Sequence, residues 1–333
     1  MPTNAQIINK AGALVTGNVT SGLLNDEQSK AFLKQVFDST ALGGLIRRET
    51  RRSKTGEIDK IGIASRILRK KVENIDANSD GTVPVYDPLT GQITGYRAKP
   101  TFDKIEYATK AVRLPWEITE ETLRENIEGQ GLEATVTDLM TKQLGLDLED
   151  LYLNGDESVS TTDPDHDFIY INDGWVKQIS NGGHIYDAID QPAMTLDMFY
   201  DGVSALPNKY NNGSLRWLMS PRRAQEWEKN LLNKALDNGA SVPDSIYKSP
   251  VSIPVITVPS LPDDIIILTD PKNLIVVVTY GIIIRKTTEG KDAIMGDKRF
   301  YVVHLDFDVV VEELDATAII KNIGVVEDEI DEG

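Results

Sequence analysis

The most regular hydrophobic pattern in the chain is a four-residue repeat over residues 132–154. Its apolar positions are Val136, Met140, Leu144, Leu148 and Tyr152, with Leu132, Leu139 and Leu151 beside them. This period predicts an amphipathic helix with one buried face and a length of about 36 Å. Asn154 and Gly155 follow directly and predict a left-handed residue that ends the helix.

A shorter helix is predicted near the N-terminus, with Asn25 or Asp26 as its cap. Its apolar face consists of Ala31, Phe32, Val36 and Phe37. Further on, Thr195 begins a helix to about residue 206, and Ser220 begins another to about residue 238. We interpret residues 1–45 as an arm that carries one helix.

Alternating positions predict strands in the C-terminal third. From residue 301 the odd positions are apolar and the even positions are mostly polar: Val303, Leu305, Phe307, Val309 and Val311 against His304, Asp306, Asp308 and Glu312. One face of this strand should be buried and the other should be in contact with water. Shorter strands are predicted at residues 168–171, 175–179 and 215–219.

Residues 57–114 have the pattern of β structure without a core of its own. Strands are predicted around residues 61–67, at 83–85 and over 102–114. Few large apolar residues occur between residues 74 and 100. This segment should therefore project from the body as an extended loop. A projecting strand pair needs a neighbouring subunit to cover it, which favours a structural protein that assembles.

Charge is unevenly distributed along the 333 residues, whose formal net charge is −17. Residues 1–110 contain 17 Lys and Arg against 12 Asp and Glu, whereas the remainder contains 18 against 40. A negative body with a positive arm suits head-to-tail contacts between copies.

The chain contains no cysteine, which excludes disulfides and thiolate chemistry. It has no signal-peptide pattern and no run long enough to span a membrane, so we expect a soluble intracellular protein.

A basic segment at residues 47–71 is the leading candidate site. It holds ten Lys and Arg against three acidic residues and lacks aromatic residues for base stacking. We expect intersubunit contacts from Arg47, Arg48, Arg51, Arg52, Lys54, Lys70 and Lys71. The alternative is a nucleic-acid-binding module, which would require steeply salt-dependent binding.

Sites for metals and cofactors are weakly supported. Residues 163–167 combine Asp163, Asp165, His166 and Asp167, but Phe168 occupies the place where a calcium loop needs glycine. We therefore expect a solvated turn there, with a divalent cation as the alternative. No metal site and no cofactor are predicted.

Catalytic motifs are incomplete. Residues 12–17 have the glycine spacing of a phosphate loop without its lysine, and residues 202–206 lack the second glycine of a nucleophile elbow. His184 is expected in a loop, and His304 is expected to pair with Asp306 on the surface of a strand. Glu120 and Glu121 are explained by their place in the first turn of a helix, where the helix dipole favours negative charge. We expect Asp147, Glu149 and Asp150 on a water-facing surface of the long helix. We predict no enzymatic activity; a carbohydrate-active enzyme with paired carboxylates is the weakest alternative.

Three stretches together resemble one family, the major capsid proteins of tailed bacteriophages, whose fold also occurs in herpesvirus shells and encapsulins. Residues 51–58 with the β segments to residue 114 resemble its extended loop. Residues 115–119 with the helix to residue 156 resemble its spine helix. Residues 220–223, 253–256 and 267–271 resemble the strand, helix and return of its axial domain.

The resemblance implies an α+β fold with five parts. These are an N-terminal arm at 1–45, an extended β-hairpin loop at 46–112, a peripheral domain with the spine helix at 113–194, an axial domain at 195–290, and return strands with an acidic tail at 291–333. It implies hexamers and pentamers that form an icosahedral head around double-stranded DNA, without sequence-specific binding. It also implies location in the virion after assembly in the host cytoplasm, a separate scaffolding protein, a portal and decoration proteins. An encapsulin-like compartment is the alternative with the same fold.

Overall fold

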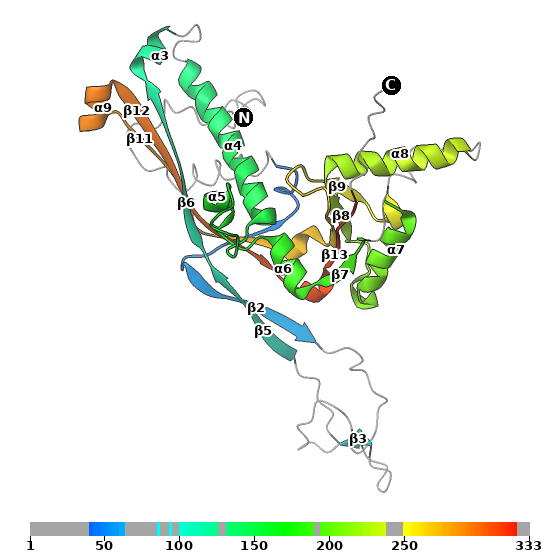
Figure 1. Cartoon of the computed structure of the whole chain (residues 1–333). Coiled ribbons are helices and arrows are strands. Elements are labelled where there is room, and N and C mark those ends of the chain that lie inside the picture. Colours follow the sequence, from blue (N-terminus) through cyan, green and yellow to red (C-terminus); the bar gives the residue numbers. More distant parts are fainter. Residues whose placement is uncertain are drawn as a thin grey trace, which may run out of the picture. The chain divides into compact units, whose positions relative to one another are not determined.

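The computed structural model describes residues 40–63, 85–86, 93–94, 100–125, 131–189, 194–237 and 249–324. The chain forms two compact units. One comprises Met1–Lys54 with Ala108–Gly333, and the other is Thr55–Tyr107. Figure 1 traces the elements of each. No helix among the described residues has the length and apolar character that a membrane span requires. The helix predicted at residues 25–37 lies outside the described residues.

A four-stranded sheet organises one part of the larger unit. Its order is β1 (Arg47–Thr50), β11 (Leu274–Thr287), β12 (Lys298–Val311) and β6 (Lys110–Thr119). β1 runs parallel to β11, and the other neighbours are antiparallel. The short helix α9 (Lys291–Gly296) joins β11 to β12, and α3 (Glu120–Glu125) follows β6 (Figure 1).

The alternation predicted for residues 301–312 is confirmed on one face of β12. Val303, Leu305 and Phe307 are buried in the main hydrophobic core, as are the next odd positions. The prediction of a water-facing opposite side was wrong. Asp306 is only 6% exposed, and its carboxylate forms an ion pair with Lys54 at 2.9 Å. Asp308 accepts the backbone N–H of Ala108 at 2.7 Å. Burial raises the pKa of Asp308. Asp306 is buried and His304, Asp308 and Glu312 are half-buried, so this face is partly covered as well.

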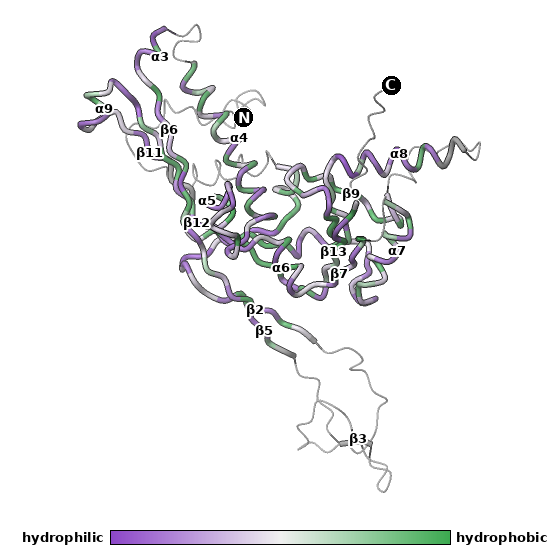
Figure 2. The backbone as a smooth tube through the Cα atoms, in the orientation of Figure 1, coloured by the Kyte–Doolittle hydropathy of each residue, from purple (hydrophilic) through white to green (hydrophobic). Residues whose placement is uncertain are grey.

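The long helix is confirmed as α4 (Gly131–Asn154), along which hydrophobic and hydrophilic residues alternate (Figure 2). Leu144, Leu148 and Tyr152 enter the core, but Leu139 is exposed on another face. The predicted left-handed stop was wrong, because Gly155 does not have a positive φ. A Cβ at this position would lie 2.4 Å from the carbonyl oxygen of Asn172, so close backbone approach explains this glycine.

Two segments predicted as strands are helices. Residues 168–171 overlap α5 (His166–Ile169), and residues 175–179 lie in α6 (Trp175–Gly182). Trp175 and Ile179 are fully buried one helical turn apart. The ring of Trp175 lies 5.8 Å from that of Tyr152 on α4, so α6 packs on the end of the long helix.

A five-stranded sheet organises the second core of the same unit. Its order is β7 (His184–Asp187), β13 (Ala318–Lys321), β10 (Ile266–Thr269), β8 (Arg216–Met219) and β9 (Val255–Thr257). The helices α7 (Leu196–Ala205) and α8 (Pro221–Asp237) begin where predicted, and Thr195 caps α7 through the N–H of Met198. Short 3-10 turns complete the fold at η2 (Asn208–Tyr210), η3 (Pro250–Ser252), η4 (Pro271–Asn273) and η5 (Leu314–Ala316).

The smaller unit is a β-hairpin with little buried surface. β2 (Thr55–Ile63) pairs with β5 (Pro100–Ala108), and β3 (Val85–Tyr86) pairs with β4 (Ile93–Thr94). The single strand predicted over 102–114 is two strands, because β5 belongs to this hairpin while β6 pairs with β12. Thr109 separates them and donates its N–H to the carbonyl of Lys54 at 2.8 Å.

Candidate assembly surface

The basic segment begins as the edge strand β1, where opposite charges alternate along one face. The guanidinium of Arg47 lies 2.7 Å from Glu49 and 3.0 Å from Glu312, which is on the segment after β12. Arg51 lies 3.3 Å from the same Glu49 carboxylate. The hydrogen bond to Glu49 raises the pKa of Arg47 despite partial burial. Of these pairs, only Arg47–Glu312 links β1 to a distant segment, whereas the pairs with Glu49 lie within residues 47–51.

The other predicted contact residues divide into three groups. Arg48 donates to the carbonyl of Gly43 at 2.7 Å, and Lys54 is bound by Asp306. Arg52 is exposed to solvent. Lys70 and Lys71 lie outside the described residues. The intersubunit role of the seven residues stays a prediction. Within the described part of the chain, Arg52 is exposed, and the Lys54 side chain is 66% exposed although it pairs with Asp306.

A buried carboxylate on α4 anchors the chain just before β1. Glu149 is 3% exposed, and its Oε1 accepts the backbone N–H of Leu42 at 3.0 Å. Burial raises the pKa of Glu149, although backbone hydrogen bonds from Leu42 and Ala41 oppose that shift. The prediction that Glu149 faces water was wrong. The cause is a long-range contact with residues 40–46, which helical spacing does not reveal.

Near the N-terminal end of α4, a second carboxylate is partly buried among cations. Glu133 is bound by Lys286 on β11, by Arg299 on β12 at 2.8 Å, and by the hydroxyl of Tyr301 at 2.7 Å. Burial alone would raise the pKa of Glu133, but the bonds from Lys286 and Tyr301 and the nearby charges lower it overall. Arg299 also binds Glu120 in the first turn of α3 and lowers its pKa.

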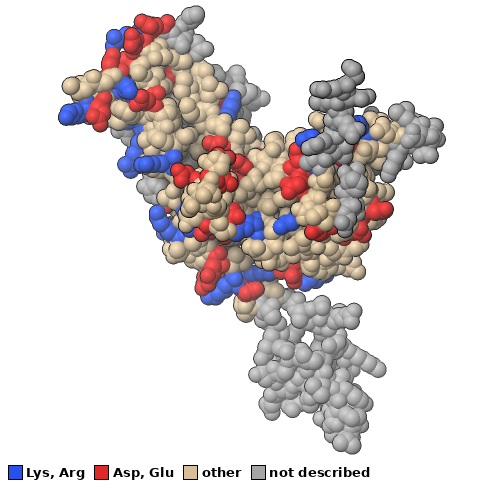
Figure 3. Space-filling view, in the orientation of Figure 1, with Lys and Arg blue, Asp and Glu red and all other residues tan. Residues whose placement is uncertain are grey.

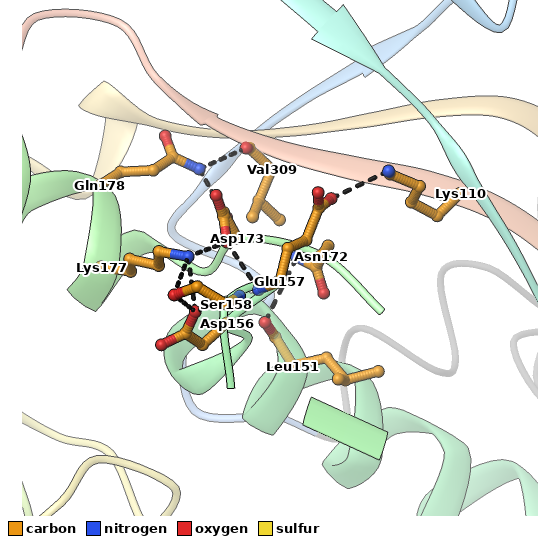
Figure 4. A network of polar contacts seen from close by, with 10 residues as sticks. All are labelled: Lys110, Leu151, Asp156, Glu157, Ser158, Asn172, Asp173, Lys177, Gln178 and Val309. Carbon is orange, nitrogen blue, oxygen red and sulfur yellow. Dashed lines mark hydrogen bonds and ion pairs between the residues drawn. The ribbon is translucent and has the colours of Figure 1, made fainter. Parts of the chain in front are cut away.

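A polar network follows the C-terminal end of α4 (Figure 4). The ammonium of Lys177 lies 2.5 Å from Asp156 and 2.7 Å from Asp173. Burial alone would lower the pKa of Lys177, but these two carboxylates raise it overall, which favours the charged ammonium. Nearby, Gln178 donates to the carbonyl of Val309 at 2.7 Å and accepts the N–H of Val311 at 3.2 Å. The network thus ties α6 to β12.

The other candidate residues do not converge on a reactive site. Asp163 and Asp165 lie in the turn before α5, and His166 stacks on Tyr170 at 5.0 Å. Across the described residues, no group of three or more His, Cys, Asp or Glu is placed to hold a metal. His184 begins strand β7, so its assignment to a loop was wrong.

The last catalytic candidates also have structural explanations. Asp306 is paired with Lys54 rather than with His304. Gly202 lies in α7, as predicted, where a Cβ would be 3.1 Å from Ile320 on β13. The phosphate-loop glycines at residues 12–17 lie outside the described residues.

Exposed apolar side chains are the feature that sequence reasoning did not assign to a function. On the hairpin of the smaller unit, Ile61 is 68% exposed and Phe102 is 73% exposed. On α9, Ile294 and Met295 are also exposed. In the view of Figure 3, basic and acidic side chains lie close together on the described surface of the larger unit. Large apolar side chains left exposed are the part of this surface that favours contact with another protein.

No protein-family model matches the chain. A Bacillus subtilis (strain 168) protein named "Putative prophage capsid protein YqbE" is 27% identical over an alignment of 336 positions, gaps included, which covers 96% of this chain and 99% of that protein. The similarity therefore extends over arm, hairpin and both sheets rather than over one motif.

Solved structures give the same result for the fold. The "Satellite phage P4 procapsid including size determination (Sid) protein" matches with a TM-score of 0.60 at 15% identity, covering 89% of this chain and 100% of that one. The capsid of an empty GTA particle matches with a TM-score of 0.56 at 11% identity, covering 97% and 100%. The holo-SrpI encapsulin complex from Synechococcus elongatus PCC 7942 matches with a TM-score of 0.51 at 12% identity, covering 98% of each chain. The chain thus has the α+β capsid fold, and its resemblance to the major capsid proteins of tailed bacteriophages is confirmed.

Proposed function

We propose that this capsid protein forms hexamers and pentamers that close into the icosahedral head of a tailed phage around double-stranded DNA. The observation that carries this proposal is the capsid fold along nearly the whole chain, together with similarity to a prophage capsid protein over 96% of its length. The role is structural, and we predict that the protein has no enzymatic activity. The finished protein is a component of the virion, and we propose that it assembles in the host cytoplasm.

The hairpin of the smaller unit supports contact between copies. Ile58 and Tyr107 are its buried hydrophobic residues among those described, whereas Ile61 and Phe102 remain exposed. Covering a large apolar side chain contributes about 1.5–3 kcal/mol. A second copy of the chain is the partner that a self-assembling shell provides, so we propose that it covers Ile61 and Phe102.

The basic segment then has two separate roles. Arg47 and Arg51 are already paired with acidic residues of their own chain, and the Arg47–Glu312 pair links β1 to the segment after β12. We propose that Arg52, Lys70 and Lys71 contact an acidic surface of a neighbouring copy. Such contacts give geometric definition and speed of association more than affinity.

The proposed division into five parts follows the predicted boundaries. Residues 1–45 would be the arm, 46–112 the extended loop, 113–194 the peripheral domain, 195–290 the axial domain, and 291–333 the return strands and acidic tail. We also propose a separate scaffolding protein, a portal and decoration proteins as partners. The DNA inside the shell would be enclosed without sequence-specific binding.

An encapsulin-like compartment is the second candidate, since an encapsulin has the same fold. Similarity of 27% to a prophage capsid protein over nearly the full length favours the phage shell. A nucleic-acid-binding module is less well supported, because Arg47, Arg51 and Lys54 are bound by carboxylates within the chain.

Assembly can be measured directly. The full chain, produced with and without its scaffolding protein, should yield rings, tubes or closed shells of megadalton mass by light scattering after size exclusion and by electron microscopy. Genome-bearing heads would support the phage function, and packaged enzyme would support the encapsulin alternative. A monomer or dimer under both conditions would contradict the proposal.

A further inference from the structure

Helices α7 and α8 lie next to each other on one face of the five-stranded sheet, each toward a different edge. α7 packs on β7 and β13, whereas α8 packs on β9, at the other end of the strand order (Figure 1). The rings of Phe199 on α7 and Trp227 on α8 meet at 4.9 Å within one buried cluster. The helix layer therefore has an α7 side and an α8 side, and each leaves part of its surface exposed.

The exposed surface of α7 combines acidic and apolar side chains, and we call it the α7 patch. Asp197 and Asp201 are exposed one helical turn apart, and α7 contains no lysine or arginine. Leu196 is 40% and Tyr200 52% exposed beside them. These four positions lie opposite the positions of α7 that enter the core, so they present one acidic surface with two large apolar groups.

The exposed surface of α8 combines basic side chains with one leucine, and we call it the α8 patch. Arg222 and Lys229 are seven residues apart and Leu232 follows three later, so all three lie on one side of the helix. Leu232 is 53% exposed. The Arg222 side chain remains 63% exposed although its guanidinium lies 3.4 Å from Asp263. Glu228 is also exposed, but it lies about 100° around the helix from Lys229.

The two patches are complementary to each other and not to themselves. Two copies that met through their α7 patches would oppose carboxylates, and two that met through their α8 patches would oppose cations, which is unfavourable. The α7 patch of one copy on the α8 patch of the next pairs opposite charges and covers apolar side chains on both. A contact between two different patches is heterologous, and a suitable rotation between copies closes it into a ring.

We propose that the α7 patch of one copy docks on the α8 patch of the next copy within a hexamer or pentamer. Asp197 would pair with Lys229, since Asp201 already hydrogen-bonds to Tyr186 of its own chain. Tyr200 would pack against Leu232. The inference rests on the proposed function, because it names a contact that joins subunits within one ring of the shell.

Two single-cysteine variants test this contact in the full-length chain, which contains no cysteine of its own. Chains with Tyr200→Cys and chains with Leu232→Cys are mixed, assembled with scaffolding protein where assembly needs it, and oxidised mildly. A disulfide between unlike chains should form, because docking brings the two Cα atoms within bonding range. One cysteine in each chain rules out an intrachain link.

The matched control mixes Tyr200→Cys with Ile294→Cys, which replaces a 71% exposed residue of α9. The Tyr200–Leu232 link should exceed the control link by about tenfold or more, because only docked residues are held at a high effective concentration. Gels without reductant and mass analysis of the linked peptides measure both yields.

The outcomes separate this contact from the proposed function. A Tyr200–Leu232 link between unlike chains supports the contact. A yield equal to the control, or links only between like chains, overturns it. Closed shells that lack the link overturn the contact and leave the proposed function standing. A parent chain that forms no assembly under these conditions contradicts the proposed function, and the contact is then rejected with it.

Charge reversal gives a second readout that needs no disulfide. Asp197→Lys and Lys229→Asp should each lower the fraction of chain in shells by about tenfold, because like charges then meet at every contact of the ring. Both positions are exposed, so the melting temperature should stay that of the parent. The combined variant should recover assembly, because opposite charges face each other again. Normal assembly of both single variants, or no recovery in the combined variant, would contradict the proposal.

Discussion

At the residue scale, the decisive groups are charges and glycines whose partners lie far away in the chain. Glu133 and Glu149 belong to the same helix, and the sequence predicted a water-facing position for Glu149. The structure partly buries Glu133 among cations and fully buries Glu149 against backbone N–H groups. Gly155 was predicted as the left-handed residue that ends the helix, but the structure requires a glycine there because the backbone of Asn172 lies too close for a Cβ. Local spacing identifies such residues without revealing their partners.

The two carboxylates should affect stability with opposite dependence on pH. The pKa of Glu149 is raised in the folded protein. The stability that this carboxyl contributes to the folded state is therefore fully present below the unfolded pKa, and it is lost as pH rises through the folded pKa. The pKa of Glu133 is lowered, so its contribution is present above the unfolded pKa and is lost as pH falls through the folded pKa.

Urea unfolding from acid to neutral pH measures this difference. The free energy of unfolding of Glu149→Gln, taken relative to the parent chain, should rise as pH rises, because only the parent then carries a buried charge at this position. The free energy of unfolding of Glu133→Gln relative to the parent should fall over the same range, because the variant lacks the carboxylate that pairs with Lys286 and Arg299. Parallel pH profiles for the two variants would contradict the assigned environments.

At the scale of elements, long regular patterns were predictable and short ones were not. The repeat of 132–154 gave the position of α4, and the odd positions of 303–311 gave the buried face of β12. Trp175 and Ile179 were placed in a strand because positions four apart share a face in both helix and strand. Over five residues the two periods cannot be distinguished. The even face of β12 was misjudged because its covering groups, Lys54 and Ala108, are distant in sequence.

The core face of α4 should dominate the stability of the larger unit. Leu144 is 7% exposed within the main core, so Leu144→Ala should lower the free energy of unfolding by about 2–5 kcal/mol. Lys142→Ala is a matched control on the same helix, because its exposed ion pair with Asp138 contributes about 0.2–1 kcal/mol. Denaturant unfolding measures both variants, and similar losses would show that the face of Leu144 is not core.

At the scale of the whole molecule, two units meet different requirements. The larger unit closes two hydrophobic cores around its sheets, whereas the hairpin of Thr55–Tyr107 leaves Ile61 and Phe102 in solvent. The low apolar content of residues 74–100 was enough to predict a segment without its own core. The capsid fold was predictable from the order of three stretches. Which side chains of the basic segment meet a neighbour was not, because most of the described ones are used within the chain.

Electron microscopy of Ile61→Asp with Phe102→Asp tests the central claim that the hairpin joins copies of this chain into a shell. The parent chain and the control variant Asp103→Asn should form closed shells under the same conditions, including scaffolding protein where assembly needs it. The double variant should remain folded, with the parent's melting temperature, yet fail to close shells because two charges would be buried against the neighbour. Normal shells from the double variant would contradict the account.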